Sequence, residues 1–127
     1  MNRGAAVSAT PWMRAASGLE ILTGLALVAT PSLLARLLFA SDLNAAGEAT
    51  GRIAGLVMLC LALGCWPRGD GDSDRRQALL PLMALSWLAA AFLILFVLIG
   101  ANAGLLLWPA AALHLIFAVL LTRAWIA

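Results

Sequence analysis

Charged side chains are the scarcest feature of this sequence. Only 11% of its 127 residues are charged, whereas 64% are apolar. Soluble domains carry about a quarter charged residues and about half apolar ones. A chain of this length cannot bury so much apolar surface in water, so the bilayer has to act as its solvent. The composition therefore excludes a soluble globular domain and predicts one integral membrane domain, residues 1–127.

Lysine is absent, so all eight basic residues are arginine, and the net charge is only +2. The arginines form no continuous basic stripe, which excludes nucleic acid as an expected partner. The lipid bilayer is the partner that the composition requires.

Groups that could carry chemistry are equally few. The two cysteines, Cys60 and Cys65, point in different directions on a helix, so no disulfide is expected. With a single histidine in addition, they predict no metal site. The sequence contains no Gly-x-Ser-x-Gly, phosphate-loop or His-Glu-x-x-His motif. We therefore expect a protein that is not an enzyme and has no resident cofactor.

Four apolar segments are long enough to cross a bilayer, at about residues 11–29, 44–66, 76–99 and 105–125. Residues 31–39 differ, because four leucines share one helical face and Arg36 lies off it, which is typical of a helix in the membrane surface. The alternative is a Pro31-kinked continuation of the first span. The predicted fold is all-α: a four-helix antiparallel transmembrane bundle with a short interfacial helix between the first two spans.

The arginines also predict orientation. Six lie at one end of the expected bundle and at most two, Arg36 and Arg52, at the other. Positive residues favour the cytoplasmic side. We expect a multi-pass protein of the bacterial inner (cytoplasmic) membrane with both termini cytoplasmic.

Glu20 is the anomaly of the first span. A bare charge at mid-membrane costs about 2.5–3.5 kcal/mol on insertion scales. Counting about 1.5 Å per residue along each expected helix puts a set of polar residues at a similar depth. We expect this intramembrane polar layer to contain Glu20, Arg52, Ser86, Trp87 and His114.

Two partners are open to Arg52. It can pair with Glu20 and hold the first two spans together, or it can pair with Glu48, four residues earlier on its own helix. In the second case Glu20 is left to His114, to Ser86 or to its protonated form, which is cheaper to bury. Glu20 then suits a proton carrier or a ligand counter-ion.

His114 is the only histidine. Small residues four positions on either side, Ala110 and Ala118, leave room for a ligand. With Trp125 the segment resembles the helices of light-harvesting proteins, which implies a haem or pigment ligand. A hydrogen-bonded packing histidine is the simpler interpretation, and two histidines on one haem are excluded within one copy.

Small residues predict where helices touch. Gly51 and Gly55 have the Gly-x-x-x-Gly spacing, and Gly24 extends a small-residue stripe on the first span. Such stripes favour close helix packing, within the bundle or with a membrane-protein partner or a second copy.

The chain resembles small multidrug transporters in its size and in the glutamate of its first span, Glu20. That family's substrate-site residues find no counterparts here, since tyrosine is absent and residues 67–77 form a charged loop. Gly18-Leu19-Glu20, Pro31 and the Gly51–Gly55 motif also resemble uncharacterised small four-helix bacterial inner-membrane proteins. This resemblance covers the first half of the chain and implies architecture alone.

Three functions follow as hypotheses. The first is a non-enzymatic accessory or structural subunit of a larger membrane complex. The second is a proton-coupled small-solute transporter that uses Glu20. The third is a haem-, pigment- or quinone-binding membrane module that uses His114.

Overall fold

The computed structural model describes residues 9–68, 72–100 and 102–126. Within these residues every regular element is an α-helix, and there are no strands. The helices are α1 (Ala9–Ala29), α2 (Pro31–Phe39), α3 (Ala45–Gly64), α4 (Asp72–Leu98) and α5 (Leu107–Ile126). Four of them are long and apolar enough to cross a membrane.

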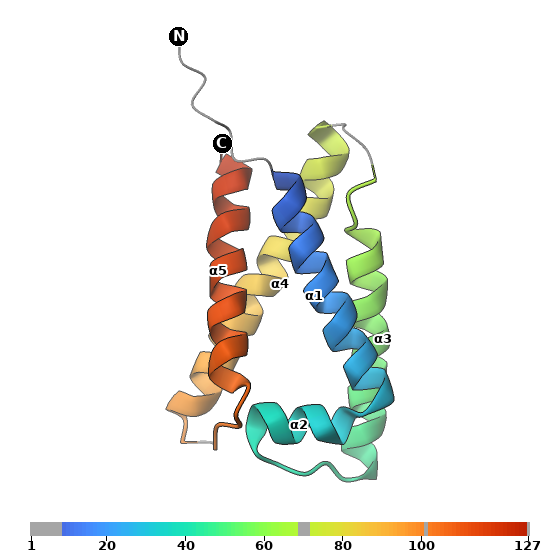
Figure 1. Ribbon diagram of the computed structural model, residues 1–127, viewed down its shortest axis with the longest axis vertical. Coiled ribbons are helices and arrows are strands. Elements are labelled where there is room, and N and C mark those ends of the chain that lie inside the picture. Colours follow the sequence, from blue (N-terminus) through green and yellow to red (C-terminus); the bar gives the residue numbers. More distant parts are fainter. Residues whose placement is uncertain (1–8, 69–71, 101, 127) are drawn as a thin grey trace.

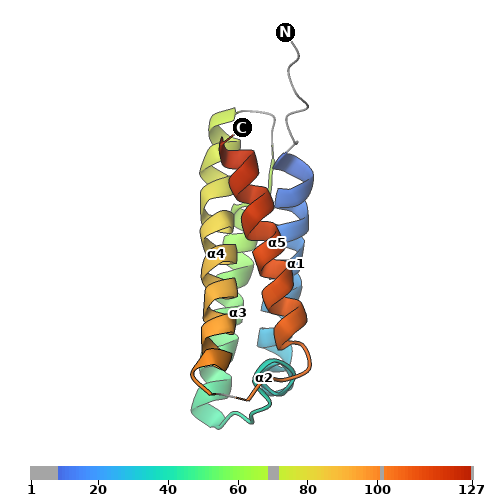
Figure 2. The same cartoon turned by 90° about the vertical axis from the view of Figure 1, so that its left-hand side faces the viewer.

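The long helices form an antiparallel bundle, and α2 lies across one end of it, nearly perpendicular to the others (Figure 1). α1 packs most extensively on α3, and α4 on α5. The start of α1 and the end of α5 lie at the opposite end from α2, together with the start of α4 (Figure 2). The predicted fold class is confirmed, and the kinked continuation of the first span is wrong.

Helix boundaries differ modestly from the predicted ones. α3 ends at Gly64, before the expected end near residue 66, and α5 begins at Leu107 rather than near residue 105. α4 begins at Asp72 and passes through Pro81 without a break. α2 occupies the predicted residues 31–39 and follows Thr30, which is not helical (φ −143°, ψ 65°).

Glycine allows α1 and α3 to touch through their backbones. A Cβ atom added to Gly55 would lie 2.6 Å from the Gly24 carbonyl oxygen, and one added to Gly24 would lie 2.9 Å from the Gly55 oxygen. Real Cβ atoms do not approach this closely, so both positions require glycine. Gly51 extends the contact, since a Cβ atom there would lie 2.9 Å from Cβ of Pro31. The three predicted packing glycines thus line the α1–α3 contact and its continuation at α2.

The C-terminal end of α2 is bound to the chain just before α5. The last carbonyl groups of a helix have no partners within it. Here the backbone N–H of Gly104 donates to the Leu38 oxygen (2.9 Å), and that of Leu106 donates to the Leu37 oxygen (2.8 Å). The chain turns away from the helix through Ala40, which is left-handed (φ 49°). These bonds connect α2 to the other half of the bundle.

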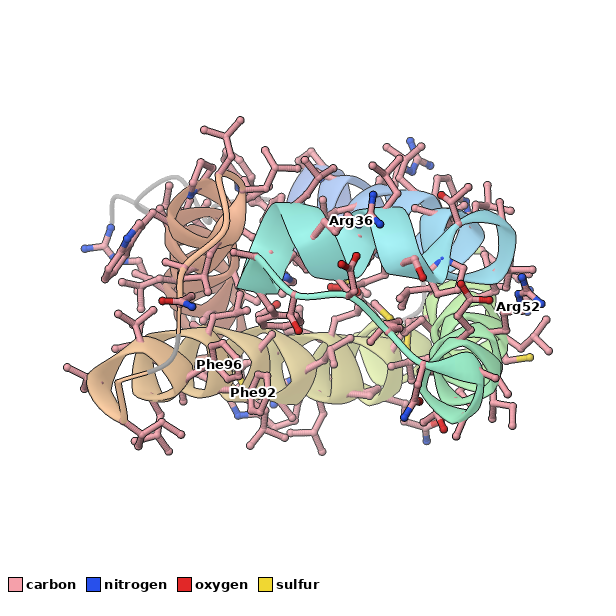
Figure 3. The ribbon with its side chains drawn as sticks, turned by 90° about the horizontal axis from the view of Figure 1, so that it is seen from below. Arg36, Arg52, Phe92 and Phe96 are labelled. Atoms are coloured by element: carbon pink, nitrogen blue, oxygen red, sulfur yellow. The ribbon has the colours of Figure 1, made fainter. Side chains whose placement is uncertain are left out.

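Side chains hold the two ends of α2 as well. The Ser32 hydroxyl donates to a Glu48 carboxylate oxygen of α3 (2.6 Å). Phe39 packs on Phe92 and Phe96 of α4, with ring centroids 6.3 Å and 4.7 Å away. Seen from below, α2 crosses the end of the bundle beside these two rings (Figure 3). α2 is therefore fixed to both helix pairs.

Two apolar clusters occupy the ends of the bundle. The larger one lies toward the termini and includes Met13, Leu79, Leu82, Phe117 and Leu121. The smaller one lies toward α2 and is formed by Leu93, Leu107 and Ala111, with Phe39 packed against it. On α4 and α5 a stretch of each helix lies between the two clusters, and the polar residues are found there.

We expect Gly55→Ala to destabilise the bundle by about 1–3 kcal/mol, because the new methyl group overpacks a backbone contact. Gly18→Ala is the matched control on α1, since a Cβ atom there meets nothing within 4 Å. Alanine also forms helix better than glycine by up to about 1 kcal/mol, so the control is neutral or stabilising. Unfolding of the purified protein in increasing SDS measures both. Equal losses for the two variants would contradict the backbone contact.

Candidate functional site

The site is a carboxyl–imidazole pair between α1 and α5. Glu20 is only 2% exposed. Its Oε1 atom lies 3.7 Å from Nδ1 of His114, whose side chain is 12% exposed. That separation is too long for a hydrogen bond. It leaves the two groups facing each other without a direct bond.

Three buried polar atoms in this region have no hydrogen-bond partner among the described residues: Oε2 of Glu20, Nδ1 of His114 and Oγ of Ser17. Buried polar atoms without partners are rare in folded proteins and call for a bound group or a water molecule. Burial also favours the neutral pair over two separated charges. The arrangement is suited to take up a polar group or to pass a proton between carboxyl and imidazole.

Ser86 lies on α4 between the two apolar clusters, as does His114 on α5. It is 2% exposed. Its hydroxyl donates to the Leu82 carbonyl oxygen of its own helix (2.8 Å), which satisfies the hydroxyl hydrogen. The hydroxyl oxygen retains lone pairs as an acceptor.

Trp87 faces away from this interior. It is 44% exposed. Its Nε1–H donates to the Thr122 hydroxyl oxygen on α5 (3.0 Å). The residue joins α4 to α5 along the outside of the bundle, since it follows Ser86 and points about 100° away from it around the helix.

Arg52 also points outward, and its partner is Glu48. Its Nη2 lies 3.8 Å from Oε2 of Glu48, and its side chain is 54% exposed. In Figure 3 it projects from the α3 side of the bundle. Of the two partners open to Arg52, the structure has the local one. Among the five residues of the expected layer, it brings Glu20 and His114 together and directs Arg52 and Trp87 outward.

A cavity of about 350 Å³ adjoins His114. Thr23 and His114 are its polar side chains; its other lining residues are apolar and come from α1, α2, α4 and the α5 region. Phe92 and Pro109 line it and are exposed, so it opens toward the outer surface of the bundle. Glu20 does not line the cavity. It lies behind His114, on the Nδ1 side of the ring.

The sequence interpretation missed the wall of this cavity. Thr23 lies three residues after Glu20, and its hydroxyl donates to the Leu19 oxygen (3.0 Å). Leu34 and Leu38 of α2 also line the cavity. The apolar face of residues 31–39 was visible in the sequence, but the cavity that it covers depends on the tilt of the long helices.

The described residues contain no group of three or more potential metal ligands. Comparison of the chain with protein-family models, with curated proteins and with solved structures finds no match.

We expect Arg52→Gln to change stability by no more than about 1 kcal/mol, because exposed ion pairs contribute little. Removing one partner of a buried pair costs about 3–5 kcal/mol. SDS unfolding of Arg52→Gln therefore tests the partner assignment, with Arg14→Gln, an exposed arginine of α1, as the control. A large loss confined to Arg52→Gln would show that Arg52 supports Glu20.

Proposed function

We propose that this protein is a non-enzymatic, membrane-embedded binding module for a lipid-soluble molecule with a neutral hydroxyl or carbonyl head, as in phenols and quinones. His114 binds the head, and Glu20 is a positioning residue behind it. The observation that carries the proposal is the buried Glu20–His114 pair at the wall of an apolar cavity.

The pair can serve either kind of head. When Nδ1 of His114 carries the proton and faces a Glu20 carboxylate oxygen, Nε2 is an acceptor for a hydroxyl group. When Glu20 is protonated as well and the imidazole proton is on Nε2, Nδ1 accepts from the carboxyl group and Nε2–H becomes a donor for a carbonyl oxygen. The second state holds one proton more than the first, so uptake of one proton by the facing pair changes which head group His114 prefers.

The size and lining of the cavity support an apolar ligand. An apolar cavity of about 150 Å³ holds benzene, so about 350 Å³ is enough for one substituted ring. The exposed Phe92 and Pro109 at its edge give access from the bilayer, where such molecules are concentrated. A permanently charged ligand is disfavoured, because the side chains that line the cavity are apolar apart from Thr23 and His114 and carry no fixed charge.

We further propose that the protein lies in a bacterial inner membrane with both termini in the cytoplasm. The arginine distribution supports this: Arg14, Arg68, Arg76 and Arg123 lie toward the end that holds the termini, whereas Arg36 lies on α2 at the other end (Figure 3). Positive residues favour the cytoplasmic side.

The proposal is tested with 4-(trifluoromethyl)phenol, whose ¹⁹F signal reports binding to the protein in nanodiscs. We expect saturable binding that weakens about 5- to 150-fold in His114→Leu, because a buried hydrogen bond is worth about 1–3 kcal/mol when its partner is left unpaired. Glu20→Leu should also weaken binding, and Glu20→Gln should restore much of it, because an amide can still orient Nδ1.

Leu115→Ala is the matched control, since Leu115 is exposed beside His114 on α5. It should bind the phenol as the wild type does. Trifluoromethylbenzene, which lacks the hydroxyl group, should bind more weakly to the wild type and be indifferent to His114→Leu. Phenol binding that survives in a folded His114→Leu variant would refute the assigned role of His114.

A second candidate function is an accessory subunit of a larger membrane complex. The observation that favours it is an exposed apolar face on α3. This helix packs on α1 and α2 with one side, and its other side leaves four large apolar side chains exposed: Ile53, Leu56, Val57 and Leu63. Another membrane protein or a second copy can cover this face by helix packing.

Purification in a mild detergent tests this candidate. We expect a second polypeptide or a second copy to co-elute, and Leu56→Trp on α3 to reduce its share because the larger side chain disturbs helix packing. Leu88→Trp on the exposed side of α4 is the control and should leave it unchanged. A monodisperse single chain would contradict the subunit role.

A further inference from the structure

We propose that a second cavity, between α1, α2 and α3, holds the apolar chain of the ligand whose head binds at His114. This inference rests on the proposed function and extends it from a ring-sized ligand to a chain-bearing one. The binding site then has two compartments: a head compartment at His114, and a chain compartment beside the N-terminal half of α3.

The second cavity has a volume of about 500 Å³. Thr50, Gly51 and Ala54 of α3 form one wall, and α1 and α2 contribute apolar side chains to the others. The Thr50 hydroxyl donates to the Ala46 oxygen of its own helix (2.9 Å), which satisfies its hydrogen. Such a compartment suits methylene groups and offers little to a polar head.

The two cavities share part of their lining. Thr23 of α1 and Leu34 and Leu38 of α2 line both of them. These three side chains therefore form the boundary between the head compartment and the chain compartment. Leucine rotamers interconvert easily compared with backbone movements, so a chain can pass this boundary without a change in the fold.

α2 holds the two compartments together. Its N-terminal part is bound to α3 through Ser32 and Glu48, and its C-terminal part is bound to the chain before α5 through Gly104. The exposed Arg36 ion-pairs with Asp42 on the outer side of α2. The helix thus forms a fixed floor under both cavities, and a ligand that spans them packs on its inner face.

A ligand chain is favoured over a free lipid chain because the two cavities share lining residues and adjoin each other. A lipid chain that entered from the bilayer would fill the second cavity independently of His114. A chain attached to a bound head is held at the boundary by the head itself, so its second binding event is intramolecular and gains effective concentration. Dependence on the head is therefore the property to test.

The first experiment compares 4-ethylphenol with 4-decylphenol at equal mole fraction in nanodiscs of one lipid composition, each as a competitor of 4-(trifluoromethyl)phenol. We expect affinity to rise about tenfold from ethyl to decyl, since the chain exchanges loose lipid contacts for packed ones. Ala54→Phe fills the chain compartment and should reduce the gain to less than about twofold, with 4-ethylphenol affinity unchanged.

Ala49→Phe is the matched control, because Ala49 is exposed on α3 and does not line either cavity. It should keep the wild-type gain. If 4-ethylphenol binds and the gain is absent, or persists undiminished in Ala54→Phe, the chain compartment is refuted while the head site stands. If neither phenol competes, the proposed function fails as well.

A second measurement locates the chain. Decylphenol with a diazirine at its terminal carbon should label residues 47–54 of α3 on irradiation, and excess 4-ethylphenol should remove that labelling. A terminal-diazirine decane without the phenol serves as the control, and its labelling should be insensitive to 4-ethylphenol. Labelling of residues 47–54 that 4-ethylphenol does not displace would overturn the inference in favour of a free lipid chain.

Discussion

The burial of Glu20 is the constraint on which the arrangement of this bundle depends. A carboxyl group in the middle of a span is costly in lipid, so the helix that carries it has to turn that face toward protein. α1 does so by packing on α3 and approaching α5, where His114 meets the carboxyl group. A bundle built without α1 in this position would leave Glu20 facing hydrocarbon.

His114 lies between the two apolar clusters along α5, yet the Glu20–His114 pair is not fully satisfied. His114 and Glu20 are 3.7 Å apart, and a buried atom on each lacks a partner. A purely structural pair is expected to close to hydrogen-bond distance, because an unsatisfied buried polar atom costs about 1–3 kcal/mol. Unsatisfied atoms directly behind the His114 wall of a cavity favour a site that a ligand or a proton completes.

Depth along the membrane was predictable, and direction around each helix was not. A rise of about 1.5 Å per residue places Glu20 and His114 at one level from the sequence alone. Ser86 and Trp87 are adjacent in sequence, but one faces the interior and the other the outside. Their facing depends on the rotation of α4 against α5, which is set by packing across the whole interface. The sequence therefore placed Glu20 and His114 at the same depth, whereas the outward positions of Arg52 and Trp87 could be seen only in the structure.

The bounds of α2 could also be predicted from the sequence, whereas its long-range contacts could not. The leucine-rich face of residues 31–39 and the proline at its start predicted α2 with its correct bounds. Its backbone bonds to Gly104 and Leu106 join segments more than sixty residues apart and leave no local pattern. Those bonds fix α2 beneath both cavities. The walls of the proposed binding site therefore depend on contacts between residues that are far apart in the sequence.

Charge explains why the site should discriminate among ligands. When Glu20 is protonated and His114 is neutral, the pair carries no charge, so an uncharged head binds without leaving a net charge buried. A charged head would instead leave an uncompensated charge in a mostly apolar cavity. Selection for neutral heads and selection for apolar chains then have the same cause, which is the scarcity of charged side chains in this sequence.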